Sequence, residues 1–197
     1  RKQFKEELLA EIAAILAFSA IQNNDKVGVI FFSDKIEKFI SPKKGSTHIL
    51  RIIRELIDFK PDNTKTDITE ALRYFTNVIK KKSTAFLISD FYDNNYEDAL
   101  KIASKKHDIV AIRITDEKEK SLPDLGLVKI YDPETNKTLW IDTSSKDVRN
   151  DFEQSYNDHS RYVNETFRKY GIDNVEISTG QDYVKQLMKL FKQREHK

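Results

Sequence analysis

Short apolar runs alternate with longer amphipathic segments along most of the chain, and no other feature limits its possible folds as strongly. Some runs are rich in β-branched and aromatic residues and too short for helices, so we predict strands at 27–34, 84–89, 108–115 and 174–179. The segments between them carry apolar residues at helical spacing, so we predict helices at 3–22, 47–58, 67–80, 96–105, 145–170 and 182–193. This alternation predicts a doubly wound α/β fold, whose mostly parallel sheet has helices on both faces.

Two segments depart from this rhythm. "KIEKFIS" (35–41) alternates apolar and polar residues and predicts a short edge strand. Residues 127–142 contain two strand-like runs around the turn "PETN", and we predict a β-hairpin inserted beside the main sheet. Gly171 follows the longest helical pattern and is expected to end it as a left-handed cap. No linker divides the chain, so residues 1–197 are expected to form a single domain.

Composition excludes several classes of function. The 34 Lys and Arg residues nearly balance the 32 Asp and Glu residues, which argues against a nucleic-acid-binding surface. Without cysteine, any metal must be held by oxygen or imidazole ligands, and the usage suits a reducing compartment, so we expect a cytoplasmic protein. No apolar stretch approaches the roughly 18 residues that span a bilayer, so we expect no membrane segment in this chain.

Two places at the predicted sheet edge carry candidate ligands. Asp90 ends the apolar run "TAFLIS", and Thr66 precedes the helix that we expect to start at Asp67. Ligands of doubly wound sheets bind at the carboxyl ends of the strands, where both residues are expected. Each residue also has a structural interpretation, since Thr66 can cap the helix and Asp90 can accept backbone N–H groups in a turn. Asp34 and Asp93 are interpreted as turn residues.

Other chemically active side chains do not form a recognisable motif. The four histidines lie in unrelated segments without the paired spacing of metal ligands, and we assign structural or solvated roles to His48, His107, His159 and His196. Tyr131 and Trp140, in the predicted hairpin, fit either a recognition surface or ordinary sheet packing.

Several segments, in their order and spacing, resemble a known family. They are "DKVGVIFFSD", "TKTDITEAL", "TAFLISDFYD", "DIVAIRI" and "STGQDYVKQLMKLFKQRE". Together they cover nearly the whole chain and resemble a von Willebrand factor type A domain, in particular the bacterial branch of unknown function found beside MoxR-type AAA+ ATPases. The resemblance implies a site for Mg²⁺ that recognises a carboxylate of a partner protein. It assigns metal ligation to Thr66 and Asp90, and it implies that the flanking residues Lys65, Asp67 and Phe91 contact the partner.

One part of the family pattern has no match. The D-x-S-x-S motif, which follows the first strand in the family and supplies its main metal ligands, occurs nowhere in the chain. We therefore expect that this strand lies upstream of Arg1, and that its place is between the strands at 27–33 and 84–89. With Thr66 and Asp90 alone, and with the positive charge of Lys65 beside them, we expect this chain to bind Mg²⁺ weakly or not at all.

Two functions from different classes remain. The first is a metal-dependent protein-interaction module whose partner is a MoxR-type AAA+ ATPase or its client. The second is a phosphoryl hydrolase or other metal-dependent enzyme that uses Asp90. The chain has only 5 glycines and no Gly-rich phosphate loop, and it shows no Ser/His/Asp arrangement, so we expect no enzyme activity.

Overall fold

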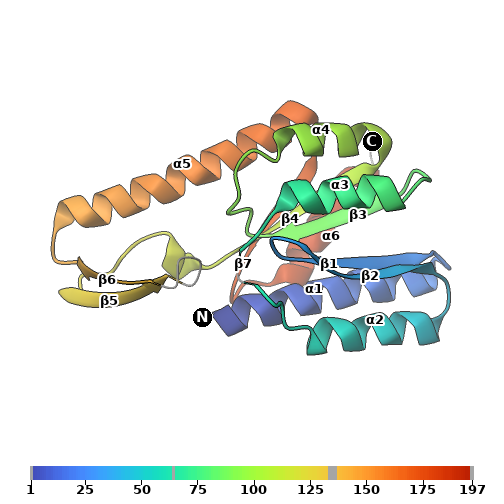
Figure 1. Cartoon of the computed structure of the whole chain (residues 1–197), viewed down its shortest axis with the longest axis horizontal. Coiled ribbons are helices and arrows are strands. Elements are labelled where there is room, and N and C mark those ends of the chain that lie inside the picture. Colours follow the sequence, from blue (N-terminus) through green and yellow to red (C-terminus); the bar gives the residue numbers. More distant parts are fainter. Residues whose placement is uncertain (1, 64, 133–136, 196–197) are drawn as a thin grey trace.

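A computed structural model describes residues 2–63, 65–132 and 137–195 (Figure 1). The elements are α1 (Lys2–Gln22), β1 (Val27–Phe32), β2 (Ile36–Lys43), α2 (Ser46–Asp58), α3 (Ile68–Val78), β3 (Thr84–Ser89), α4 (Glu97–Lys106), β4 (Asp108–Thr115), η1 (Glu117–Glu119), β5 (Leu127–Asp132), β6 (Lys137–Asp142), α5 (Lys146–Tyr170), β7 (Asp173–Ser178) and α6 (Tyr183–Glu195). Each predicted helix and strand is present, with ends that differ from the prediction by no more than two residues.

The central layer is a parallel sheet with the strand order β3-β4-β7. Leu87 of β3 lies opposite Ala111 of β4. One face of the sheet is covered by α3, α4 and α5, which contribute Leu72, Leu100 and Val163 to a buried cluster. The other face is covered by α1 and α6, whose buried residues Leu8, Ile12 and Leu187 pack against Ile112, Ile114 and Ile177. The predicted doubly wound α/β architecture is confirmed.

β1 and β2 form a separate antiparallel pair, so the predicted short edge strand is confirmed. Phe31, Ile40 and Ile52 join this pair to α2 in a cluster of their own. Among the residues that the structure describes, no ladder joins β1 to β3. The two strands therefore have not closed up on each other, as expected if a further strand belongs between them.

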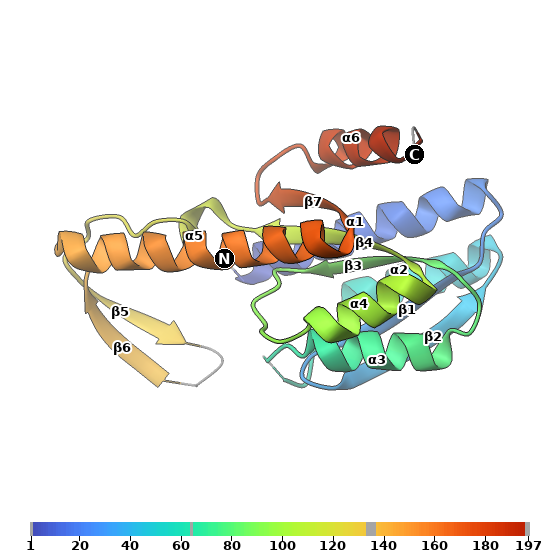
Figure 2. The same cartoon turned by 90° about the horizontal axis from the view of Figure 1, so that it is seen from above.

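The hairpin is confirmed as a sheet of its own, in which β5 and β6 pair antiparallel with Val128 opposite Ile141. Its predicted turn at 133–136 lies outside the described residues. Figure 2 shows the hairpin at one end of α5, beyond the end of the parallel sheet.

α5 is the longest helix in the described part of the chain, with 25 residues. From Tyr156 onward it is anchored on the sheet by the buried residues Tyr156, Val163 and Phe167, whereas the part before Tyr156 runs past the sheet to the hairpin (Figures 1 and 2). Gly171 ends the helix with a φ of 64°, which confirms the predicted left-handed cap. No helix in the described ranges is long and apolar enough to cross a membrane.

Candidate functional site

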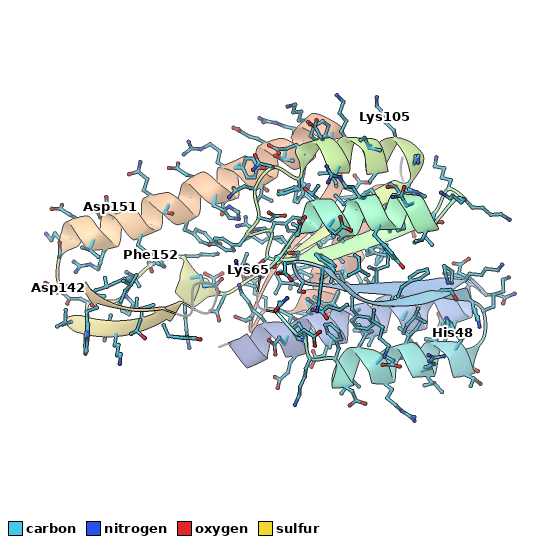
Figure 3. All side chains as sticks on the ribbon, viewed as in Figure 1. His48, Lys65, Lys105, Asp142, Asp151 and Phe152 are labelled. Atoms are coloured by element: carbon cyan, nitrogen blue, oxygen red, sulfur yellow. The ribbon has the colours of Figure 1, made fainter. Side chains whose placement is uncertain are left out.

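Three loops meet at the carboxyl end of the parallel sheet: the turn after β1, the segment before α3 and the loop after β3. Figure 3 shows Lys65, in the segment before α3, at the end of the molecule's main body that faces the hairpin. The backbone N–H of Asp67 donates to the carbonyl of Ser33, 2.8 Å away. The Asn63 amide donates to Asp34 Oδ1 at 2.8 Å. These bonds fix the loops relative to one another, so this edge is a preformed surface.

Asp90 is engaged within the chain in two ways. Its Oδ1 accepts the N–H of Tyr92 at 3.3 Å, as the turn interpretation predicted. Its Oδ2 lies 3.6 Å from the Lys5 ammonium of α1, and the side chain is about one third exposed. Lys5 also pairs with Glu119 at 2.6 Å. A cation approaching Asp90 therefore meets a carboxylate whose charge is already shared with a lysine.

The structure corrects the predicted start of α3. Asp67 is the N-cap residue and its Oδ1 accepts the N–H of Glu70 at 2.7 Å, so the prediction of Thr66 as the cap was wrong. The physical reason is that the helix starts one residue later, at Ile68, and an aspartate is at least as good a cap as a threonine. Thr66 is half-buried and Lys65 is exposed. Within the described ranges, no hydrogen bond engages the Thr66 hydroxyl.

Asp93 has a second structural role at this edge, besides the turn role that the sequence predicted. Its Oδ1 does accept the N–H of the next residue, Asn94, at 2.7 Å. Its Oδ2, however, accepts the N–H of the buried residue Ile68 at 2.7 Å and so satisfies the first turn of α3. The signal that could have revealed this role is a carboxylate three residues after Asp90, because a neighbouring helix N-terminus needs acceptors at the same edge.

Phe91 is not available to a partner. Its side chain is fully buried, with its ring centroid 5.0 Å from Phe167 and 6.0 Å from Tyr96. Its φ is 60°, which is uncommon for a bulky residue. The expectation that Phe91 contacts a partner is therefore corrected: the residue turns inward and anchors the loop that carries Asp90 and Asp93.

The histidines in the described part of the chain have structural environments. His107 is buried against Phe75, and burial, followed by the charge of Lys106, lowers its pKa. The His48 Nε2 lies 2.9 Å from the carbonyl oxygen of Val27. His159 stacks on Tyr92 with ring centroids 4.2 Å apart. Burial, followed by the nearby charge of Arg113, lowers the pKa of His159. His196 lies outside the described residues.

Tyr131 and Trp140 of the hairpin are 58% and 64% exposed, with Leu127 and Leu139 exposed to a similar extent. Neither aromatic side chain is buried in a sheet core, although sheet packing was one of the two interpretations of these residues. The hairpin therefore presents apolar side chains to a binding partner or to solvent.

The residues present do not fit a self-sufficient Mg²⁺ site. The described ranges contain no group of three or more histidine, aspartate or glutamate residues placed to hold a metal ion. Asp90 and Thr66 would supply two oxygen ligands. Mg²⁺ takes six oxygen ligands in an octahedral shell, and water supplies only some of them. The Lys5 ammonium beside Asp90 further opposes a second cation.

We expect titration of Mg²⁺ into this chain, followed by calorimetry, to give a dissociation constant weaker than about 1 mM. Replacing Lys5 with methionine should strengthen the binding by no more than about tenfold, because it removes one opposing charge but adds no ligand. A dissociation constant in the low micromolar range for either chain would contradict this prediction.

Comparisons with known proteins agree with the fold. A chain described as the conserved hypothetical protein BatB from Bacteroides thetaiotaomicron superposes with a TM-score of 0.55 at 13% identity, covering 95% of this chain and 89% of that one. An aerotolerance-related membrane protein from Bacteroides fragilis gives a TM-score of 0.56 at 13% identity, covering 93% and 88% of the two chains. Identities this low establish the shared fold alone, a doubly wound α/β fold.

Relatives in sequence are themselves uncharacterised. The protein MAV169 of Mycobacterium avium is 27% identical over 135 residues, which cover 68% of this chain and 79% of that protein. The protein Rv1480 of Mycobacterium tuberculosis is 22% identical over 195 residues, which cover 96% of this chain. The chain spans 61% of the length of Rv1480. The model of the family described as "Protein of unknown function DUF58" matches residues 1–162, and the chain therefore belongs to the DUF58 family.

Proposed function

We propose that this chain is a protein-interaction module whose binding surface is the loop edge at the carboxyl end of the parallel sheet. The observation that carries the proposal is the set of bonds that hold the loops in place, from Asp67 to Ser33 and from Ile68 to Asp93. A surface fixed in this way binds without paying the entropy of ordering its loops. Thr66, Asp90 and the exposed Lys65 are the residues that we assign to contact with the partner, and Asp67 supports them as the cap of α3.

The finer part of the proposal concerns the metal. We propose that Mg²⁺ contributes to partner binding only when further oxygen ligands join Thr66 and Asp90, as the resemblance to von Willebrand factor A domains implies. A strand carrying D-x-S-x-S between β1 and β3 would supply them. The separation of the β1–β2 pair from the β3-β4-β7 sheet supports this placement, because it leaves one edge of β1 and one edge of β3 without a ladder partner in the described ranges.

We further propose a MoxR-type AAA+ ATPase or its client as the partner, in the cytoplasm. The family resemblance supports this choice, and the near balance of basic and acidic residues is consistent with a protein partner. The chain has the fold of a protein named as aerotolerance-related. The enzyme alternative has less support, since the Asp90 carboxylate is paired with the Lys5 ammonium.

The test uses a chain extended at its N-terminus by the residues encoded upstream of Arg1, together with the MoxR-type ATPase encoded nearest to it. We expect binding that needs Mg²⁺, is lost in EDTA and weakens at least tenfold in Asp90→Ala and in Thr66→Ala. Asp98→Ala, an exposed substitution in α4, serves as the control and should bind normally. Binding that is equal in EDTA and in Asp90→Ala would contradict the proposed site. Turnover of a phosphate ester that disappears in Asp90→Ala would instead establish the enzyme alternative.

A further inference from the structure

Arg113 is the largest fully buried side chain in the described part of the molecule, with 2% of its surface exposed. It lies in β4, the middle strand of the parallel sheet, between Ser89 of β3 and Glu176 of β7. Its guanidinium carbon lies 5.9 Å from the centre of the Tyr156 ring of α5, so the charge is enclosed between the sheet and that helix. A buried arginine is normally matched by a carboxylate or by a full set of hydrogen bonds.

Only one of the three guanidinium nitrogens of Arg113 has a hydrogen-bond partner among the described residues. Nη1 lies 3.3 Å from an oxygen of Glu176, whose side chain is 39% exposed. Nε and Nη2 are buried and have no hydrogen-bond partner among the described residues. These two nitrogens form the edge of the guanidinium that presents two parallel N–H groups, and this edge binds carboxylates and phosphates through paired hydrogen bonds.

Other acidic side chains near the end of β4 are engaged elsewhere. Asp90 and Glu119 share Lys5. The buried Asp116 accepts the N–H of Lys118 at 2.9 Å as the cap of η1. Among the described residues, no carboxylate accepts a hydrogen bond from Nε or Nη2 of Arg113.

α5 adds hydroxyl groups to the same buried layer. Tyr156 Oη and Ser160 Oγ are both buried and have no hydrogen-bond partner in the described ranges. The two residues are four apart and so lie on one face of α5, the face that carries Tyr156 over Arg113. Hydroxyl and guanidinium groups can all donate to one anion.

We infer that the open edge of Arg113 binds a small inorganic oxyanion, phosphate or sulfate, between β4 and α5, with the Tyr156 hydroxyl as a further donor. The anion would compensate the buried charge and tie α5 to the sheet. Arg113 and Tyr156 are not among the residues assigned to partner contact.

The test follows thermal unfolding of the 197-residue chain in phosphate and in chloride at equal ionic strength. We expect phosphate to raise the midpoint temperature along a saturating curve, by about 5 to 10 °C at a hundredfold excess over the dissociation constant. Titration of phosphate into the protein labelled with ¹⁵N-arginine should shift the Nε–H signal of Arg113 over the same concentration range.

Variants separate specific binding from general salt effects. Arg113→Lys keeps the charge but not the paired N–H groups, and it should weaken phosphate binding at least tenfold; Tyr156→Phe should weaken it about fivefold. Arg161→Lys, the same substitution at an exposed position of α5, should respond like the unmodified chain. If phosphate stabilises Arg113→Lys as much as the unmodified chain, the inference is wrong. If Arg113→Lys does not fold, an Arg113 Nε–H signal that phosphate leaves unmoved overturns the inference on its own.

Discussion

Replacing Phe91 with alanine is expected to lower the free energy of unfolding by about 3 to 5 kcal/mol. The ring is fully buried and packs edge-on against Phe167 of α5, so its loss leaves a cavity between the loop after β3 and that helix. For a domain of this size, such a loss lowers the midpoint of thermal unfolding by about 10 °C. Chemical denaturation followed by circular dichroism measures the change directly.

The backbone at Phe91 makes the prediction sharper. A φ of 60° disfavours any residue with a Cβ by about 1 to 2 kcal/mol, whereas glycine adopts this conformation freely. Phe91→Gly should therefore be about 1 kcal/mol more stable than Phe91→Ala, although it removes more of the side chain. The neighbouring substitution Tyr92→Ala removes a 43% exposed ring that stacks on His159, and it should lower stability by only about 1 kcal/mol. Equal effects at positions 91 and 92 would show that Phe91 does not anchor the loop.

Asp93→Ala is expected to lower the free energy of unfolding by about 2 kcal/mol, because it leaves the buried N–H of Ile68 without its acceptor. Asp90→Ala is the matched comparison, since it removes the same group three residues earlier in the same loop. Its partly exposed carboxylate makes a 3.3 Å turn contact and a 3.6 Å ion pair, so the expected loss is below about 1 kcal/mol.

For partner binding, we expect the opposite order: Asp90→Ala should have the larger effect and Asp93→Ala the smaller one. Asp90→Ala is expected to weaken partner binding at least tenfold in a folded protein, whereas Asp93→Ala should weaken it less, because it loosens the loop without removing a residue that contacts the partner. Equilibrium unfolding and partner binding, measured on both variants, test this separation. Two equally destabilised variants, or a partner that does not distinguish them, would show that Asp90 and Asp93 share one role.

The architecture was predictable because it depends on local patterns. The period of the apolar residues distinguished helices from strands, and the single glycine at 171 marked the end of α5. The hairpin at 127–142 was recognisable for the same reason, since its two strands and their turn are adjacent in the sequence.

The details of the candidate site depend on contacts between distant segments, which periodicity does not reveal. Phe91 follows an aspartate in a loop and has the appearance of an exposed residue, but its burial depends on Phe167, far along the chain. The partner of Asp93 is an amide of α3, a helix that precedes it by a strand and a loop. Arg113 interrupts the apolar run of β4, and the sequence interpretation gave it no role, because nothing local shows that both neighbouring strands and α5 enclose it.

The N-terminal part of α5 extends beyond the parallel sheet and makes the molecule longer than its core (Figure 2). From Lys146 at its N-terminus to Tyr156, its first buried residue, the helix rises about 15 Å at about 1.5 Å per residue. The hairpin with Trp140 is attached at that far end, on the side of the molecule to which the partner surface belongs (Figures 1 and 3). A rigid helix carries load along its axis, so a pull on the hairpin would reach the sheet at Tyr156, directly over Arg113. Tyr156 is therefore the first buried contact between the overhanging part of α5 and the sheet.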